Sequence, residues 1–294
     1  MSTANAPEQA LWLPCGAEQL FAVLHPASGN TGVLVVVGGP QYRAGSHRQF
    51  VMLARELAAG GFPVMRFDLR GMGDSTGPFP GFENCDADLR AAIDGFLAHM
   101  PQIQRVVLWG LCDGASAALL YLQRQPAEAR VSGLCLLNPW VRSAQTLAQA
   151  RVKHYYRQRL ADPAFWRKLL GGGVSWRAPF EWLQARLAAR QGHERTPAAT
   201  LGFQQRMRLG LGGFGGCTML ALSGRDLTAQ EFEQACAAEP EWQRILAGAK
   251  VRTLRFPTAD HTFSELKAQQ DLFDATLQWL RDITSPARPS SGQA

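Results

Sequence analysis

The stretch VVLWGLCDGASAALLYLQ, residues 106–123, decides the fold class of this chain. Four apolar residues typical of a strand lead into the turn Gly-Leu-Cys-Asp-Gly at 110–114, and an apolar run at helical spacing follows. Such a strand-to-helix turn is the nucleophile-elbow pattern G-x-S-x-G, here with Cys112 where the pattern has serine. The glycines are needed because larger side chains would collide with neighbouring backbone. The pattern predicts a catalytic nucleophile at Cys112; a buried small apolar residue is the alternative.

Apolar strands and amphipathic helices alternate on both sides of this turn. The strands are continuous apolar runs, which are typical of strands buried on both faces. The sequence therefore predicts an α/β fold with a mostly parallel central sheet and helices on both faces. Strands are predicted at 32–39, 62–69, 105–111, 131–139, 217–224 and 251–257, and helices at 47–61, 86–100, 114–125, 231–248 and 264–283.

One long segment, residues 142–216, interrupts the alternation. Its pattern is helical, and it is basic and rich in tyrosine and tryptophan. We expect it to form a helical cap over the carboxyl ends of the strands, inserted between two parts of the core at 1–141 and 217–283. The tail 284–294 is rich in proline, serine and glycine and is predicted to be disordered.

Positive charge is concentrated in this segment. Residues 142–210 contain 13 Lys/Arg against three Asp/Glu and so carry +10, whereas the whole chain carries +6 and the remainder −4. Because no nucleic-acid motif accompanies the block, we predict no nucleic-acid partner and favour an anionic substrate group, partner or membrane surface. A solvated basic face is the alternative.

Cofactor binding and membrane insertion are not indicated. The six cysteines contain no CxxC pair or metal-ligand spacing, so free thiols are expected and no metal or cofactor is predicted. No apolar run is long enough to cross a bilayer, and the N-terminus lacks the order of a signal peptide. We therefore predict a cytoplasmic protein, and no feature of the sequence specifies an oligomeric state.

Two further residues complete a candidate triad with Cys112. His261 follows the last predicted strand, and Asp226 follows the strand that comes after the insertion. Nucleophile, acid and histidine thus occur in the order of the nucleophile-elbow fold. Asp226 would accept the imidazole N–H of His261 and stabilise the charged ring. An N-cap role for Asp226 is the alternative, and Asp260 is a rival acid, although a residue adjacent to His261 is poorly placed to reach its ring.

An oxyanion hole requires two backbone N–H groups near the nucleophile. One is expected from Asp113, the residue after Cys112. The other is expected from the loop GGPQY at 38–42, whose proline has no N–H. The second donor is therefore Gly39 or Gln41.

Three motifs carry a resemblance to a known family: GGPQYR at 38–43, GLCDG at 110–114 and DHTF at 260–263. Over roughly residues 15–283 the chain resembles the exosortase A system-associated hydrolase 1 family, a branch of the α/β hydrolases. The resemblance implies the α/β-hydrolase fold and a hydrolase encoded in bacteria beside the exosortase system for protein sorting and exopolysaccharide production. The motif DLRGMGDS at 68–75 resembles the D-x-R-G-x-G-x-S loop common in this fold, and we interpret it as structural.

The candidate triad predicts an acyl hydrolase of esterase or thioesterase type that forms a thioester acyl-enzyme on Cys112. Because a thiolate is itself a good leaving group, thioesters, activated esters and lactones are favoured as small-molecule substrates, with an anionic handle for the basic insertion to attract. An acyltransferase and a lactone hydrolase of the dienelactone type are alternatives. A catalytically silent binding module is the alternative from another class.

Overall fold

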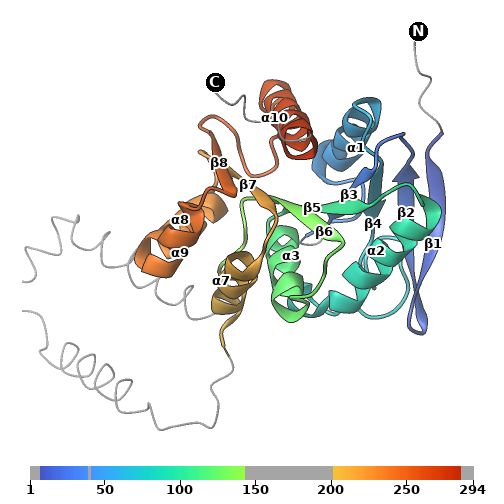
Figure 1. The fold of residues 1–294 in the computed structure, drawn as a ribbon, viewed down its shortest axis with the longest axis horizontal. Coiled ribbons are helices and arrows are strands. Elements are labelled where there is room, and N and C mark those ends of the chain that lie inside the picture. Colours follow the sequence, from blue (N-terminus) through green and yellow to red (C-terminus); the bar gives the residue numbers. More distant parts are fainter. Residues whose placement is uncertain (1–6, 39–40, 143–200, 286–294) are drawn as a thin grey trace, which may run out of the picture. The chain divides into compact units, whose positions relative to one another are not determined.

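Strand β5 (Arg105–Leu111) lies inside the sheet, and all its residues after Arg105 are buried. In the computed structural model, which describes residues 7–38, 41–142 and 201–285, the sheet has the order β1-β2-β4-β3-β5-β6-β7-β8 (Figure 1). The other strands are β1 (Gln9–Cys15), β2 (Glu18–His25), β3 (Thr31–Val36), β4 (Val64–Phe67), β6 (Val131–Leu137), β7 (Cys217–Ser223) and β8 (Val251–Phe256).

The predicted mostly parallel sheet with helices on both faces is confirmed. Strands β4, β3, β5, β6, β7 and β8 run parallel to one another, so their carboxyl ends lie at one edge of the sheet. A hairpin of β1 and β2 adds two antiparallel strands beside β4. The sequence prediction missed this hairpin because β1 lies at the sheet edge and is only partly buried, so it lacks the continuous apolar run of the inner strands.

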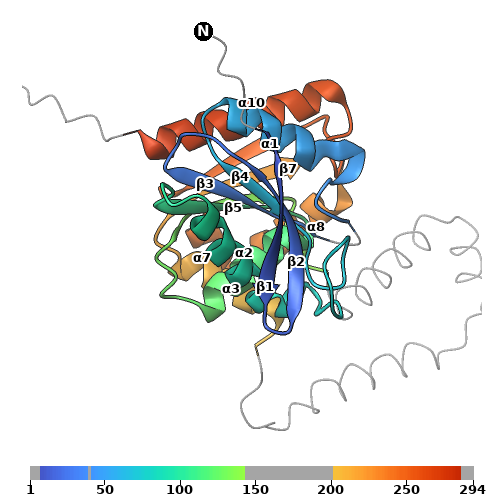
Figure 2. The same cartoon turned by 90° about the vertical axis from the view of Figure 1, so that its right-hand side faces the viewer.

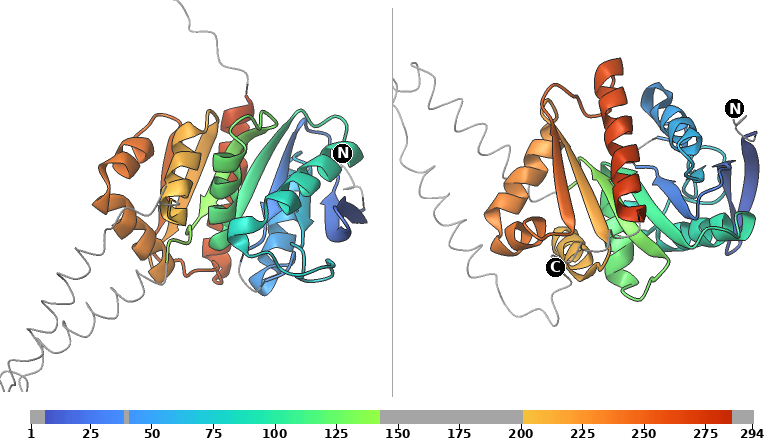
Figure 3. Two further views of the ribbon diagram at one scale, coloured as in Figure 1. Left: turned by 90° about the horizontal axis from the view of Figure 1, so that it is seen from below. Right: turned by 45° about the horizontal axis from the view of Figure 1, so that its top comes forward.

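Of the described helices, two cover one face of the sheet and the rest cover the other (Figures 1 and 2). Helices α1 and α10 lie side by side and share a buried cluster with Val33, Val35 and Trp109. Figure 3 shows α10 across this face on the right and α3 across the opposite face on the left. In the described part of the chain the helices are α1 (Gln49–Ala59), α2 (Asp86–His99), α3 (Asp113–Arg124), α7 (Phe203–Gly213), α8 (Leu227–Ala238), α9 (Pro240–Leu246) and α10 (Leu266–Thr284), with short 3₁₀ turns at Ser46–Arg48 and Phe82–Asn84.

Helix α7 belongs to the core, which corrects the predicted end of the insertion at residue 216. The chain divides into one unit of residues 1–141 and 203–294 and another of 142–202. Helix α7 packs directly on α3, and Gly210 allows the approach because a Cβ there would collide with the Leu119 carbonyl oxygen. Residues 143–200 of the cap predicted at 142–216, and residues 286–294 of the disordered tail predicted at 284–294, lie outside the described residues. Helix α10 extends to Thr284, one residue into that predicted tail.

The single helix predicted at 231–248 is two helices. Helix α8 ends at Ala238 and α9 begins at Pro240, because proline at a first helical position cannot donate the hydrogen bond that would continue the preceding helix. Among the described helices, none has the length and apolar character needed to cross a bilayer.

Candidate active site

Cys112 occupies the turn between β5 and α3. It is the N-cap residue of α3, with φ of 60° and ψ of −126°, a strained conformation for a residue with a side chain. Its backbone N–H donates to the Leu137 carbonyl at 2.9 Å, and its own carbonyl accepts from Trp140 N–H at 3.2 Å. These bonds tie the turn to β6 and the loop after it, so the surrounding structure holds the strained residue in place.

The two glycines of the turn are sterically required, as the sequence pattern predicts. A Cβ on Gly110 would lie 2.6 Å from the backbone nitrogen of Ala115. A Cβ on Gly114 would collide with the carbonyl oxygen of Val36 at the end of β3. The sharp turn and the close approach of β3 therefore depend on the absence of side chains at these positions.

The structure brings Asp226 and His261 together with Cys112. Asp226 follows β7 and His261 follows β8, so both reach the edge of the sheet at which β5 ends. Nδ1 of His261 lies 2.8 Å from Oδ2 of Asp226. The remaining ring nitrogen, Nε2, is thus left for the hydrogen bond with the Cys112 side chain.

These contacts favour a protonated His261 ring. The hydrogen bond with Asp226 and then that with Cys112 raise the pKa of His261 to about 10, although partial burial acts in the opposite direction. Burial acts to raise the pKa of Asp226, but the hydrogen bond from His261 and two backbone N–H groups bring it below its usual value. The arrangement is therefore an aspartate, an imidazolium and a sulfur atom in sequence.

Asp226 is also the N-cap of α8. Its Oδ1 accepts from Thr228 N–H at 3.0 Å, and its Oδ2 accepts from Ala229 N–H at 3.2 Å. The N-cap role and contact with His261 were alternatives in the sequence prediction, but one carboxylate does both. The rival Asp260 accepts instead from the N–H groups of Thr262 and Ser264, so its carboxylate stabilises its own loop.

Cys112 differs from most other cysteines of the chain in its exposure. It is half-buried, as is Cys217, whereas the other four are buried. Burial raises the thiol pKa of each of those four. Ser116, one helical turn after Cys112, is fully buried and donates to the Trp140 carbonyl at 2.7 Å, so its hydroxyl is occupied by packing.

Asn138, directly after β6, is a residue of the site that the sequence prediction missed. It is fully buried, has φ of 42°, and exchanges two hydrogen bonds of 2.9 Å with Ser223 at the end of β7. Its amide also donates to the His261 carbonyl at 3.2 Å. Asn138 thus joins the ends of two strands to the histidine loop. The signal in the sequence is an asparagine immediately after a buried strand, at a position that tolerates positive φ.

The predicted oxyanion residues lie partly inside the described chain. Asp113 begins α3 directly after Cys112, while Gln41 is half-buried and Gly39 lies outside the described residues. Gly38, at the start of the same loop, has no room for a side chain, because a Cβ would collide with the Asp113 carboxylate and the Gly114 nitrogen. The loop after β3 therefore begins in direct contact with the turn that carries Cys112.

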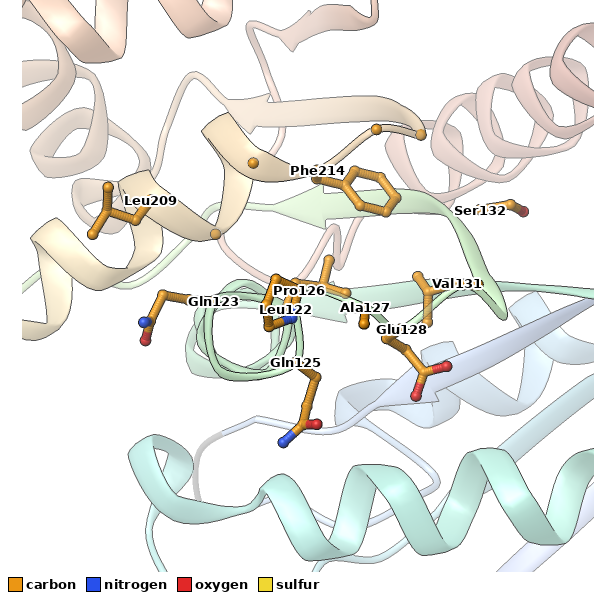
Figure 4. A pocket seen from close by; sticks show the side chains of 15 residues that line it. Leu122, Gln123, Gln125, Pro126, Ala127, Glu128, Val131, Ser132, Leu209 and Phe214 are labelled. Carbon is orange, nitrogen blue, oxygen red and sulfur yellow. The ribbon is translucent and has the colours of Figure 1, made fainter.

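A cavity of about 440 Å³ lies beside the amino end of strand β6, opposite the carboxyl end that faces the candidate triad (Figure 4). It is lined by the end of α3, the start of β6 and the end of α7, with Leu122, Val131 and Phe214 among its side chains. Because Cys112, Asp226 and His261 follow the carboxyl ends of their strands, this cavity is separate from the candidate triad. Within the described part of the chain, no three His, Cys, Asp or Glu side chains are grouped so as to hold a metal ion.

The sequence profile of the Alpha/beta hydrolase family matches residues 33–281. The chain belongs to this family. The matched span includes the turn at Cys112 and the loops of Asp226 and His261, and membership supports a hydrolase.

The chain also resembles individual proteins. Human Protein ABHD12B is 34% identical over 120 residues, which cover 39% of this chain and 32% of that protein. The chain thus spans about a third of the length of this curated relative. The esterase Pf2001 of Pyrococcus furiosus superimposes with a TM-score of 0.63 at 14% identity, covering 95% of this chain and 94% of that chain. A dienelactone hydrolase from Anabaena variabilis gives 0.58 at 17% identity, covering 94% and 98%. At these identities the structural likeness shows the fold.

Proposed function

We propose that this alpha/beta hydrolase cleaves esters or thioesters through a Cys112–His261–Asp226 triad. The observation that carries the proposal is the continuous contact from the Asp226 carboxylate through the His261 ring to the sulfur of Cys112, at a strained turn between a strand and a helix. Such a constellation activates a nucleophile and orients its base.

The proposed reaction has two halves. The Cys112 thiolate attacks the substrate carbonyl carbon, and the negative oxygen that forms is stabilised by the Asp113 N–H and by a second N–H from Gly39 or Gln41. The protonated His261 gives its proton to the leaving group, which departs and leaves a thioester on Cys112. The now neutral His261 then takes a proton from water, which attacks the thioester and releases the acid and the cysteine.

A lactone is a second candidate substrate, since the chain shares its fold with a dienelactone hydrolase. The same attack on a cyclic ester opens the ring, and the leaving alkoxide stays attached to the acyl group. Lactone hydrolysis therefore uses the same residues and differs in the shape of the substrate. An acyl acceptor other than water would make the enzyme an acyltransferase.

The identity of the nucleophile is tested by intact-mass analysis after exposure to p-nitrophenyl esters, acyl thioesters and a lactone. One acyl group should be added per chain, at the peptide that contains Cys112, and Cys112→Ala should abolish both adduct and turnover. The matched control is Cys217→Ala, because Cys217 is the other half-buried cysteine. Full turnover by Cys112→Ala would rule the proposal out, as would an acyl adduct that is found at Cys217 and is lost in Cys217→Ala.

The resemblance carried by GGPQYR, GLCDG and DHTF supports a further proposal, that the enzyme works in the cytoplasm beside an exosortase and exopolysaccharide system. We also propose that the basic segment within 142–202 forms a cap that attracts an anionic handle on the substrate. Turnover of a phosphate-bearing thioester should then fall with added salt, while a neutral ester of equal acyl length should barely respond. Matching salt profiles would remove the anionic handle and leave the esterase proposal standing.

A further inference from the structure

The motif at 68–75 takes part in two pairs of a buried carboxylate and an arginine: its Asp68 holds Arg43, and its Arg70 is held by Asp88. Asp68 and Asp88 are both fully buried. Asp88, on α2, accepts from the backbone N–H of Arg70 at 2.8 Å and from its guanidinium at 2.8–3.1 Å. Asp68, directly after β4, accepts from the backbone N–H of Arg43 at 2.6 Å and from its guanidinium. The pairs match in chemistry and burial but hold different loops.

The Asp68 pair holds the loop that follows β3. The backbone of Arg43 is fixed from both sides, because its N–H donates to Asp68 and its carbonyl accepts from the guanidinium of Arg66 at 2.8 Å. Arg66 lies on β4 and is 3% exposed. Its Nε donates to the ring of His25 at 3.0 Å, and burial lowers the pKa of His25 to about 4, so this ring is a neutral acceptor.

Burying these charges is costly unless they are paired and hydrogen-bonded. Apolar side chains in place of Arg66 and Asp68 would pack without that cost. They could not, however, hydrogen-bond a backbone N–H and a carbonyl of a neighbouring loop. The Arg43 guanidinium also lies 4.2 Å from the centre of the Phe21 ring and 2.6 Å from the Asp74 carboxylate, which fixes its direction. The cluster of Asp68, Arg66 and Arg43 is therefore suited to fixing the loop.

The loop fixed in this way is the candidate oxyanion loop. Its first residue, Gly38, abuts Asp113 and Gly114, and Arg43 is its anchor at the far end. Gln41, the described one of the two candidate N–H donors, lies two residues before that anchor. A shift of Arg43 would therefore move the donor relative to the Cys112 sulfur.

We infer that Asp68, with Arg66 and Arg43, forms a positioning cluster that places the oxyanion donor of the loop after β3. The motif at 68–75, interpreted from sequence as structural, thus has a part in the reaction. The inference rests on the proposed Cys112 chemistry. Asp68 touches no substrate and acts only through the loop, so removing it should impair steps that build negative charge on a carbonyl oxygen and spare steps that do not.

Two reactions of the same sulfur atom separate these steps. Acylation of Cys112 by p-nitrophenyl acetate develops an oxyanion, whereas alkylation by iodoacetamide displaces iodide and develops none. In Asp68→Asn the amide cannot accept every N–H that the carboxylate accepts, and the acylation rate should fall about 10²-fold. The alkylation rate and its pH profile should stay unchanged. Asp88→Asn is the matched control: it breaks an equally buried pair and should leave both rates unchanged, whatever its effect on stability.

A second variant covers the case in which Asp68→Asn fails to fold. The Arg43 side chain is 16% exposed, so Arg43→Ala should be better tolerated and should lower acylation alone. Three results would each overturn the inference. The first is an equal loss of acylation and alkylation in Asp68→Asn, and the second is a loss of acylation in Asp88→Asn as large as that in Asp68→Asn. The third is unchanged acylation in both Arg43→Ala and Asp68→Asn. Failure of the proposed function gives a different result: the wild-type protein would be alkylated at Cys112 but never acylated there. That result would overturn both the proposed function and this inference.

Discussion

Replacing Asp226 by serine and by alanine separates the two roles of this carboxylate. Its oxygens accept from Thr228 N–H at 3.0 Å and Ala229 N–H at 3.2 Å, and Oδ2 lies 2.8 Å from Nδ1 of His261. A serine hydroxyl is one bond shorter, so it still caps α8 but falls short of the ring. Alanine does neither, and the difference between the variants therefore measures the N-cap alone.

The two contributions have different sizes. Loss of the charged hydrogen bond to His261 should cost about 2 kcal/mol of unfolding free energy in both variants. Loss of the N-cap should add about 1 kcal/mol in Asp226→Ala only. Turnover should not distinguish the two variants, because it depends on the orientation and charge of the His261 ring and not on the N-cap. We expect both variants to lose about 10³-fold in kcat, within error of each other.

Urea unfolding gives the stabilities, and steady-state hydrolysis of a p-nitrophenyl ester gives kcat. Asp260→Ser is the control, since Asp260 bonds only within its own loop in the described structure, and its kcat should fall much less. Asp226→Ser with nearly full activity would refute the assignment of Asp226 as the partner of His261. Equal stability of the serine and alanine variants would refute the N-cap reasoning while leaving that assignment intact.

Three further outcomes are expected. Hydrogen bonds with Asp226 and Cys112 raise the pKa of His261 from 6.5 to about 10. The stability that the protonated ring contributes is therefore fully present below pH 6.5 and is lost as pH rises through about 10. The difference in unfolding free energy between the wild-type protein and Asp226→Ser, measured by urea unfolding, should shrink over that interval. Asn138→Ala should lose about 3 kcal/mol in the same assay, because buried partners in Ser223 and His261 are left unpaired, and a near-neutral result would contradict this. Gly114→Ala should lose about 2 kcal/mol or more from its collision with Val36, whereas Gly213→Ala, with open space around it, should not.

The meeting of Cys112, Asp226 and His261 follows from features that are local in sequence. Each residue lies in the turn or loop that follows a predicted strand, and these three strands are parallel and end at one edge of the sheet. Counting strands therefore predicts which loops meet, without any knowledge of side-chain contacts. The same reasoning explains why the hairpin of β1 and β2 was missed. Its strands are not continuous apolar runs, and no helix separates one from the other.

The residues that sequence reasoning missed act through contacts between segments distant in the chain. Asn138 bonds to Ser223 and to His261, which are 85 and 123 residues away. Asp68 was noticed within its motif, but its partner Arg43 lies 25 residues earlier, and the motif itself gives no indication of that pairing. A buried polar side chain must find a hydrogen-bond partner, and that requirement does not specify where in the sequence the partner lies.

Asp226 illustrates a different difficulty, in which two interpretations of one residue were weighed as alternatives. A carboxylate has two oxygens and about four acceptor positions, so capping a helix with two N–H groups leaves room for the imidazole. The N-cap also has a consequence for the site: the hydrogen bonds from Thr228 and Ala229 hold the carboxylate independently of its contact with His261. Asn138 fixes the histidine loop through its carbonyl, and the cluster of Asp68, Arg66 and Arg43 fixes the loop after β3. The histidine loop and the loop after β3 thus each depend on buried polar groups that do not react. Substitutions at those groups should alter catalysis through geometry while leaving the Cys112 thiol chemically intact.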